Sequence, residues 1–151
     1  LVIGGDVRKP RGPYENSLAV LEDDILQETG IHEIGIAGYP EGHPRIPPKV
    51  LTDDLDAKIS LASERGLGLE VITQFSFAPA RITEYCAALS HRAPQVPVYV
   101  GMAGPTRTSK LLRYAQYCGV SSSVRALTDM GVKAVKLASH TGHILKCIFS
   151  H

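Results

Sequence analysis

The feature that most constrains this fold is a regular alternation of short apolar runs with amphipathic segments. Four apolar runs begin at Leu1, Ile34, Leu69 and Val98, and each is followed by a turn and a segment with helical spacing. The run from Ile34 to Ala37 is apolar throughout, which is typical of a parallel strand that is buried on both faces. The alternation predicts parallel βαβ units with right-handed crossovers. We therefore expect one α/β domain over residues 1–151, with four neighbouring parallel strands in sequence order.

The expected helices carry apolar residues three and four positions apart, which places those residues on one face. The first helix has Leu21 and Ile25 on its inward face, Asn16 or Ser17 as its cap, and Gly30 at its end. The second helix is expected to run from a Thr52 cap to about position 65. The third is expected to begin at Pro79, and the fourth to cover about 108–117.

Length and charge exclude several classes of protein. The chain has 151 residues, whereas a closed eight-stranded α/β barrel typically needs about 250. Its net charge is +1 and no basic block occurs, so we expect no nucleic-acid partner. No apolar run approaches the roughly 20 residues of a membrane span, and no charged leader precedes the opening apolar run. The three cysteines are far apart and match neither a zinc spacing nor a disulfide framework, which favours a reducing cytoplasmic setting.

Polar residues follow the predicted strands at the edge where α/β folds bind ligands. They are Asp6 after the first strand, Tyr39, Glu41 and His43 after the second, Gln74 after the third, and a Gly/Pro-rich stretch over 101–105 after the fourth. Carboxyl ends of parallel strands converge at one edge, so these loops are expected to build one site. The alternative is that each is an isolated turn residue, because turns favour such residues for local reasons.

Four short motifs resemble those of the bacterial branch of the methylenetetrahydrofolate reductase family. Tyr39–Pro44 matches the Y-P-x-x-H-P signature, Gly4–Asp6 is similar to R-G-D, Ile72–Phe75 reads I-T-Q-F, and Gly12–Tyr14 matches G-P-[FY]. The resemblance covers about residues 1–128. It implies a (β/α)8 TIM barrel that binds FAD. It also implies reduction of 5,10-methylenetetrahydrofolate to 5-methyltetrahydrofolate with NADH or NADPH, within one-carbon and methionine metabolism.

The same resemblance implies roles for five residues. Asp6 would lie beside the flavin pyrimidine and the pterin, as a catalytic, folate-binding and cofactor-binding group. Tyr39 and His43 would bind FAD, and Lys58 would approach its phosphates. Gln74 would contact the pterin and the nicotinamide, and its amide can both donate and accept hydrogen bonds.

The resemblance also implies that the chain is a fragment, roughly the fourth to seventh barrel strands. The family's general acid, a Glu at the end of the first strand, would then lie before Leu1, so we expect the isolated chain to be inactive. Outer strands near Val2 and Val100 are expected to be open edges, which a closed barrel lacks. The full-length protein is expected to be a cytoplasmic homo-oligomer. The spacing of apolar residues over 132–137 suits either a helix or a strand, and the resemblance to the family favours a helix. Residues 144–149 have no counterpart in the family.

Two other interpretations remain open. The first is a non-catalytic half-barrel that binds a flavin or associates with itself through its edges. The second is a different barrel enzyme with a metal held by Asp6, Glu41 and His43, although one His and two scattered acids specify no metal; we predict none. No G-x-G-x-x-G fingerprint occurs, so a separate Rossmann cofactor domain is not indicated.

Overall fold

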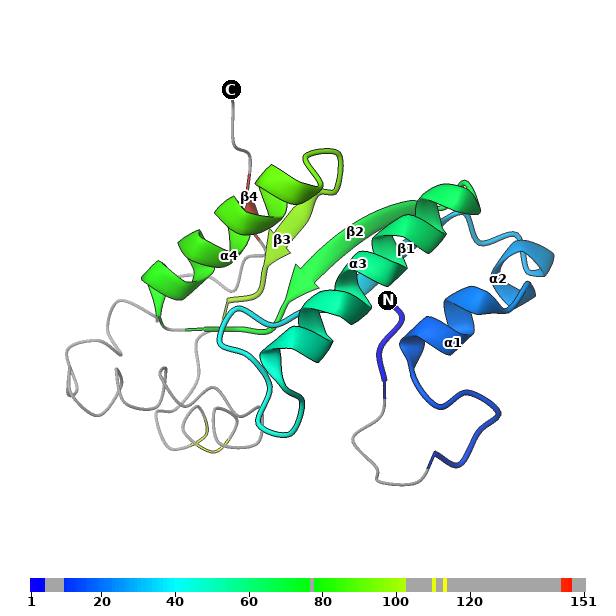
Figure 1. The fold of residues 1–151 in the computed structure, drawn as a ribbon, viewed down its shortest axis with the longest axis horizontal. Coiled ribbons are helices and arrows are strands. Elements are labelled where there is room, and N and C mark those ends of the chain that lie inside the picture. The colour runs from blue at the N-terminus through cyan, green and yellow to red at the C-terminus, as the bar shows by residue number, and fades with distance from the viewer. Residues whose placement is uncertain (5–9, 77, 103–109, 111–112, 114–144, 148–151) are drawn as a thin grey trace.

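The computed structural model of the chain describes residues 1–4, 10–76, 78–102, 110, 113 and 145–147. Helices and strands follow one another along the chain in the α/β order that the sequence predicts (Figure 1). The helices are α1 (Ser17–Glu22), α2 (Ile25–Glu28), α3 (Pro48–Glu64) and α4 (Pro79–Arg92). The strands are β1 (Glu33–Gly38), β2 (Gly68–Thr73), β3 (Val98–Val100) and β4 (Leu145–Cys147).

The central sheet has the order β1-β2-β3-β4, and its first three strands are parallel neighbours in sequence order. Ile36 lies opposite Val71, and Val71 lies opposite Val98, so apolar side chains align across the three strands. Parallel strands with intervening helices confirm the predicted α/β class and the predicted strands at 34–37 and 69–73. The strand predicted over 98–102 is present but ends at Val100. The arrangement is compatible with part of an α/β barrel.

The first predicted strand is represented only by an isolated parallel bridge. Val2 pairs with Ile36, and the Val2 N–H donates to the Gly35 carbonyl oxygen at 2.8 Å. The position beside β1 and the parallel direction are as predicted, but no regular strand forms over the described residues 1–4. Leu1 and Ile3 are 70% and 61% exposed, so this segment lacks the burial that its apolar sequence predicts.

The other edge of the sheet corrects a prediction. Strand β4 pairs antiparallel with β3, with Lys146 opposite Tyr99 and Leu145 opposite Val100. The edge near Val100 is therefore covered rather than open. The spacing of apolar residues over 144–149 does not predict this strand. Its pairing with β3 joins segments about 45 residues apart, and such a contact leaves no signal in the local sequence.

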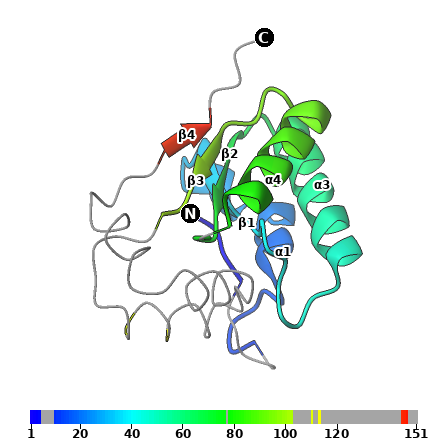
Figure 2. The same cartoon turned by 90° about the vertical axis from the view of Figure 1, so that its left-hand side faces the viewer.

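The hydrophobic core lies between one face of the sheet and the helices. Figure 2 shows α1, α3 and α4 on the same side of β1, β2 and β3. Fully buried side chains on this side include Ile36 and Val71 from the sheet, Leu21 from α1, and Cys86 and Leu89 from α4. Burial of an aliphatic side chain contributes about 1.5–3 kcal/mol, so this layer supplies most of the favourable free energy of folding.

The first predicted helix is split into α1 and α2. Asn16 caps α1 as predicted, because its Oδ1 accepts from the Ala19 N–H at 3.0 Å. The chain then leaves the helix at Asp23, whose Oδ1 accepts from the Ile25 N–H at 3.0 Å. Short polar side chains compete in this way with helical hydrogen bonding. The break turns Ile25 outward, so its predicted inward position is wrong; it is 37% exposed.

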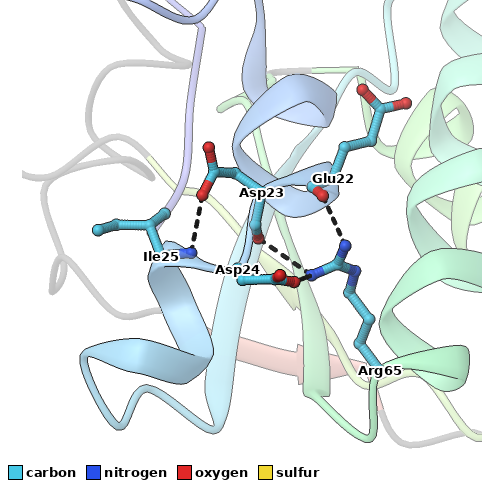
Figure 3. Close-up of polar contacts among 5 residues, drawn as sticks. All are labelled: Glu22, Asp23, Asp24, Ile25 and Arg65. Atoms are coloured by element: carbon cyan, nitrogen blue, oxygen red, sulfur yellow. Dashed lines mark hydrogen bonds and ion pairs between the residues drawn. The ribbon is translucent and has the colours of Figure 1, made fainter.

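Arg65 ties this break to the end of α3 (Figure 3). Its Nη1 donates to the Asp23 carbonyl oxygen at 3.1 Å and to Asp24 Oδ1 at 2.7 Å. Its Nη2 donates to the Glu22 carbonyl oxygen at 2.5 Å. Carbonyl groups at a helix end lack intrahelical partners, so the guanidinium satisfies the end of α1 from a position about 40 residues away.

Helix α3 begins at Pro48, four residues before the predicted cap. Pro48 occupies the first helical turn, where its missing N–H costs nothing. Thr52 is not a cap, because its hydroxyl donates to the Pro48 carbonyl oxygen at 3.1 Å inside the helix. Helix α4 begins at Pro79 as predicted. The predicted helix over 108–117 falls largely outside the described residues, and 132–137 lies outside them entirely.

Within the described part of the chain, no helix combines the length and apolar character needed to cross a bilayer.

Candidate functional site at the carboxyl ends of β1 and β2

The loop after β1 holds two aromatic rings in a fixed arrangement. The Tyr39 and His43 rings meet edge to face, with centroids 5.5 Å apart and planes at 83°. A tight turn brings them together, because the Gly42 N–H donates to the Tyr39 carbonyl oxygen at 3.0 Å. Gly42 has φ 79°, a left-handed conformation that favours glycine. Tyr39 and His43, the two residues of this loop that are predicted to bind FAD, therefore lie in contact in a defined geometry.

Glu41 lines a cleft of about 400 Å³ beside the loop after β1, and His43 lines two others, the larger of which has a volume of about 640 Å³. Its lining includes Tyr39, His43, Arg45 and Gln74. Gln74 reaches this edge because its N–H donates to the Gly38 carbonyl oxygen at 2.7 Å, which extends the β1–β2 pairing past the end of β2. The structure thus brings Gln74 to the same cleft as the two rings, as convergence of parallel strand ends predicts.

The second cleft, of about 410 Å³, lies between the same loop and α3. Tyr39 and His43 line it together with Lys58 and Asp54. Lys58 is 7% exposed, and its Nζ lies 2.5 Å from Asp54 Oδ2. A buried ammonium needs such a partner. The two residues lie one helical turn apart on α3, and both line the smaller cleft.

Close packing fixes the backbone on which the site stands. A Cβ atom on Gly38, the last residue of β1, would lie 2.6 Å from Tyr85 Oη and 2.7 Å from Val71 Cγ1. Burial of the Tyr85 hydroxyl raises its pKa to about 12. At the end of β3, a Cβ on Gly101 would collide with the Thr73 carbonyl oxygen, and the Gly101 N–H donates to Thr73 Oγ1 at 3.0 Å. The strand ends are therefore held rigidly against one another.

Of the five residues predicted for the site, four lie at these two clefts: Tyr39, His43, Gln74 and Lys58. The fifth, Asp6, lies outside the described residues. Gly4, two positions before it in the sequence, lines both clefts.

Three residues of the site escaped the sequence analysis. Asp54 is the partner of Lys58, and its i, i+4 spacing was the available signal. Arg45 lines both clefts. Its position directly after the Tyr39–Pro44 motif was the signal that could have indicated a place in the site. Tyr85 supports the loop from α4, a contact that no local pattern records.

The smaller cleft carries charged groups of both signs, because Glu15 and Asp54 line it beside Arg45 and Lys58. Lys58 is paired with Asp54. Both clefts fall within the range of about 300–1,000 Å³ typical of small-molecule and cofactor sites. Over the described ranges, no cluster of three or more His, Cys, Asp or Glu could hold a metal ion. A metal ligand set with Asp6 is untested, since Asp6 is not described.

The fold and the clefts define an α/β protein with a ligand site at the carboxyl edge of a parallel sheet. The sequence is similar to that of methylenetetrahydrofolate reductase 2 of Saccharomyces cerevisiae, with 32% identity over 98 residues. That match covers 64% of this chain and 16% of the yeast protein, so the chain spans about one-sixth of its relative. No protein-family model matches the chain. The matched stretch of the chain is thus similar to part of a methylenetetrahydrofolate reductase.

Proposed function

We propose that this chain is part of a flavin-dependent methylenetetrahydrofolate reductase and supplies one side of its FAD and folate site. The proposal rests on one coincidence. The chain is similar to a protein of that name, and Tyr39, His43 and Gln74, the residues that resemble the family's motifs, line one cleft. Residues that resemble the family's motifs on two separate loops thus line the same cavity.

The roles follow from position and chemistry. Tyr39 and His43 hold FAD on the β1 loop, and the Lys58 ammonium stands in the smaller cleft for its phosphates. Gln74 offers its amide to the pterin edge from the larger cleft. By resemblance to the family, Asp6 would supply a carboxylate that disfavours the anionic reduced flavin and holds a cationic folate. When bound, the flavin supplies hydride transfer from NADH or NADPH to the folate one-carbon unit.

The test is turnover with and without the rest of a barrel. We expect the chain alone to bind flavin and to reduce methylenetetrahydrofolate poorly, because loss of a positioned general acid costs about 10²–10⁴-fold. A polypeptide that carries the preceding barrel strands of a methylenetetrahydrofolate reductase should raise the rate of folate reduction when added in trans. A chain that yields no flavin spectrum after loading with FAD, and no turnover after complementation, contradicts the proposal.

A second candidate function is favoured by strand β4. It pairs antiparallel at the edge of β3, where a barrel would pair its next parallel strand. An occupied edge favours a half-barrel that binds flavin without catalysis. Complementation separates the two candidates, because a half-barrel with a blocked edge binds flavin and gains no turnover. Deletion of residues 145–151 should then allow complementation to proceed.

A further inference from the structure

The two faces of the parallel sheet differ in burial. Successive side chains of a strand point to opposite faces, and the helix-covered face holds the fully buried Ile36 and Val71. On the other face, Ala37, Glu70 and Ile72 keep partial exposure. Figure 2 shows α1, α3 and α4 all on the first face, and none of these three covers the second. This second side of the sheet is called the open face below.

The middle of the open face is apolar. A Cβ on Gly35 would meet Ile72 Cδ1 at 3.0 Å and Leu1 Cδ1 at 3.4 Å, so both of these side chains lie over the glycine. Leu1 and Ile3 line a cleft together with Ile72 and are still 70% and 61% exposed. Parallel sheets are normally covered on both faces, and a contiguous exposed apolar patch marks an interaction surface. We therefore expect protein to cover the open face.

Opposite charges lie at the two ends of the open face. At the amino ends of the strands, Glu33 and Glu70 line a cleft of about 560 Å³, and no described Lys or Arg lines it with them. Within the described part of the chain, neither carboxylate has a hydrogen-bond or ion-pair partner. At the carboxyl ends, Arg45 lines the larger cleft with Ile72. Ile72 follows Glu70 by two positions on β2, so it lies between the acidic end and the basic end.

The edges of the sheet are poor places for a further chain. Strand β4 already pairs with β3, and Val2 forms a parallel bridge with Ile36 of β1. A chain that continued the sheet from edge to edge would have to displace one of these segments. Packing of two sheets face to face, about 10 Å apart, leaves both in place.

We infer that the open face is a docking surface for a second copy of this chain, packed face to face with its strands reversed. A two-fold axis perpendicular to the strands and close to Ile72 brings the acidic end of each copy onto the basic end of the other. Glu70 of each copy then faces Arg45 of the other, and this contact occurs twice, as in any isologous dimer. Packing with the strands in the same direction would instead place carboxylates against carboxylates, which is unfavourable. The inference goes beyond the proposed function, because it involves neither flavin nor folate.

The oligomeric state of the flavin-free chain tests the inference directly. Sedimentation velocity over a wide range of concentrations should show a reversible equilibrium between monomer and dimer, because a two-fold contact closes on itself. A monomer at every concentration overturns the inference. Open-ended association, which pairing through sheet edges would give, also overturns it. Loss of FAD binding in a separate titration would contradict the proposed function and leave this result unchanged.

A charge exchange tests the orientation of the two copies. Glu70→Arg alone would set arginine against arginine at both contacts, and Arg45→Glu alone would set glutamate against glutamate. Each variant should weaken the dimer about tenfold or more. In an equimolar mixture of the two variants, both contacts again join opposite charges, so a heterodimer of about wild-type affinity should form. Single variants that dimerise like wild type, or a mixture that stays monomeric, overturn the inference.

Matched controls separate this contact from a change of net charge. Glu64→Arg and Arg81→Glu make the same changes of charge at exposed positions of α3 and α4, away from the open face. They should leave the dissociation constant of the dimer within about twofold, and losses equal to those of the first pair overturn the inference. Glu70→Gln removes the charge without reversing it and serves if Glu70→Arg does not fold. It should weaken the dimer about three- to tenfold, and a folded variant of unchanged affinity overturns the inference.

Discussion

Replacement of Gly38 by alanine tests how the strand end supports the site. The added Cβ would lie 2.6 Å from Tyr85 Oη and 2.7 Å from Val71 Cγ1, far inside the 3.5–4.0 Å or so of a favourable contact. Overpacking of this kind typically costs about 1–3 kcal/mol, and removal of glycine from a strand returns roughly 0.5–1 kcal/mol. We therefore expect Gly38→Ala to lower the free energy of unfolding by about 1–2 kcal/mol.

The assay is urea unfolding at equilibrium, with thermal unfolding as a second measurement. For a chain of this size, a loss of 1–2 kcal/mol corresponds to a fall in Tm of roughly 2–8 °C. Gly35→Ala is the matched control on the same strand. There the new Cβ would meet the end of the Ile72 side chain at 3.0 Å, which can move, so the cost should stay below about 1 kcal/mol.

A double-mutant cycle identifies the cause. The Tyr85 hydroxyl has no well-formed hydrogen-bond partner in the described part of the chain, so Tyr85→Phe alone should cost little. Combined with Gly38→Ala, it removes the nearest colliding atom and should restore about 0.5–1.5 kcal/mol of the loss. If Gly38→Ala is as stable as wild type, or if Tyr85→Phe restores nothing, the packing argument is wrong.

Three further predictions concern stability. Arg65→Met should lower the free energy of unfolding by about 1.5–3 kcal/mol, because it releases the end of α1 and Asp24; denaturant unfolding checks this, and an unchanged midpoint contradicts it. Lys58→Met should be nearly neutral, whereas Asp54→Asn should cost about 1–2 kcal/mol by leaving the buried ammonium without its anion; equal effects in urea unfolding contradict this. The raised pKa of Tyr85, about 12, means that its neutral form stabilises the fold fully below about pH 10 and that this stability is lost as the pH rises towards 12. Wild type should therefore lose stability relative to Tyr85→Phe above pH 10, by up to about 1.4 kcal/mol per pH unit, and parallel pH profiles of the two contradict the assignment.

The parallel sheet was predictable because its information is local. The run from Ile34 to Ala37 is apolar throughout, the runs that begin at Leu69 and Val98 are rich in β-branched residues, and glycine ends the first and the last of the three. Chain order then determines neighbours and direction through the βαβ rule. The same logic placed Gln74 beside the Tyr39 loop, since parallel strands bring their carboxyl ends to one edge.

Details that depend on distant contacts were not predictable. The break after α1 is stabilised by Arg65 from the end of α3, and an apolar stripe alone favours one continuous helix. The start of α3 depended on a choice between two local signals, and the first-turn proline prevailed over the Thr52 cap. The β4 strand exists through its pairing with β3. In the site, Asp54 was missed because an i, i+4 acid and base usually form an exposed surface pair.

The central proposal is that the loop after β1 and the end of β2 form a flavin and folate site with divided roles. The most direct measurement is a fluorescence titration of FAD against the wild-type chain, His43→Ala and Gln74→Ala. We predict saturable binding to wild type, affinity about 10- to 150-fold weaker for His43→Ala, and affinity within about threefold of wild type for Gln74→Ala. FAD affinity that falls in Gln74→Ala and stays unchanged in His43→Ala, or the absence of saturable binding to wild type, would contradict the claim.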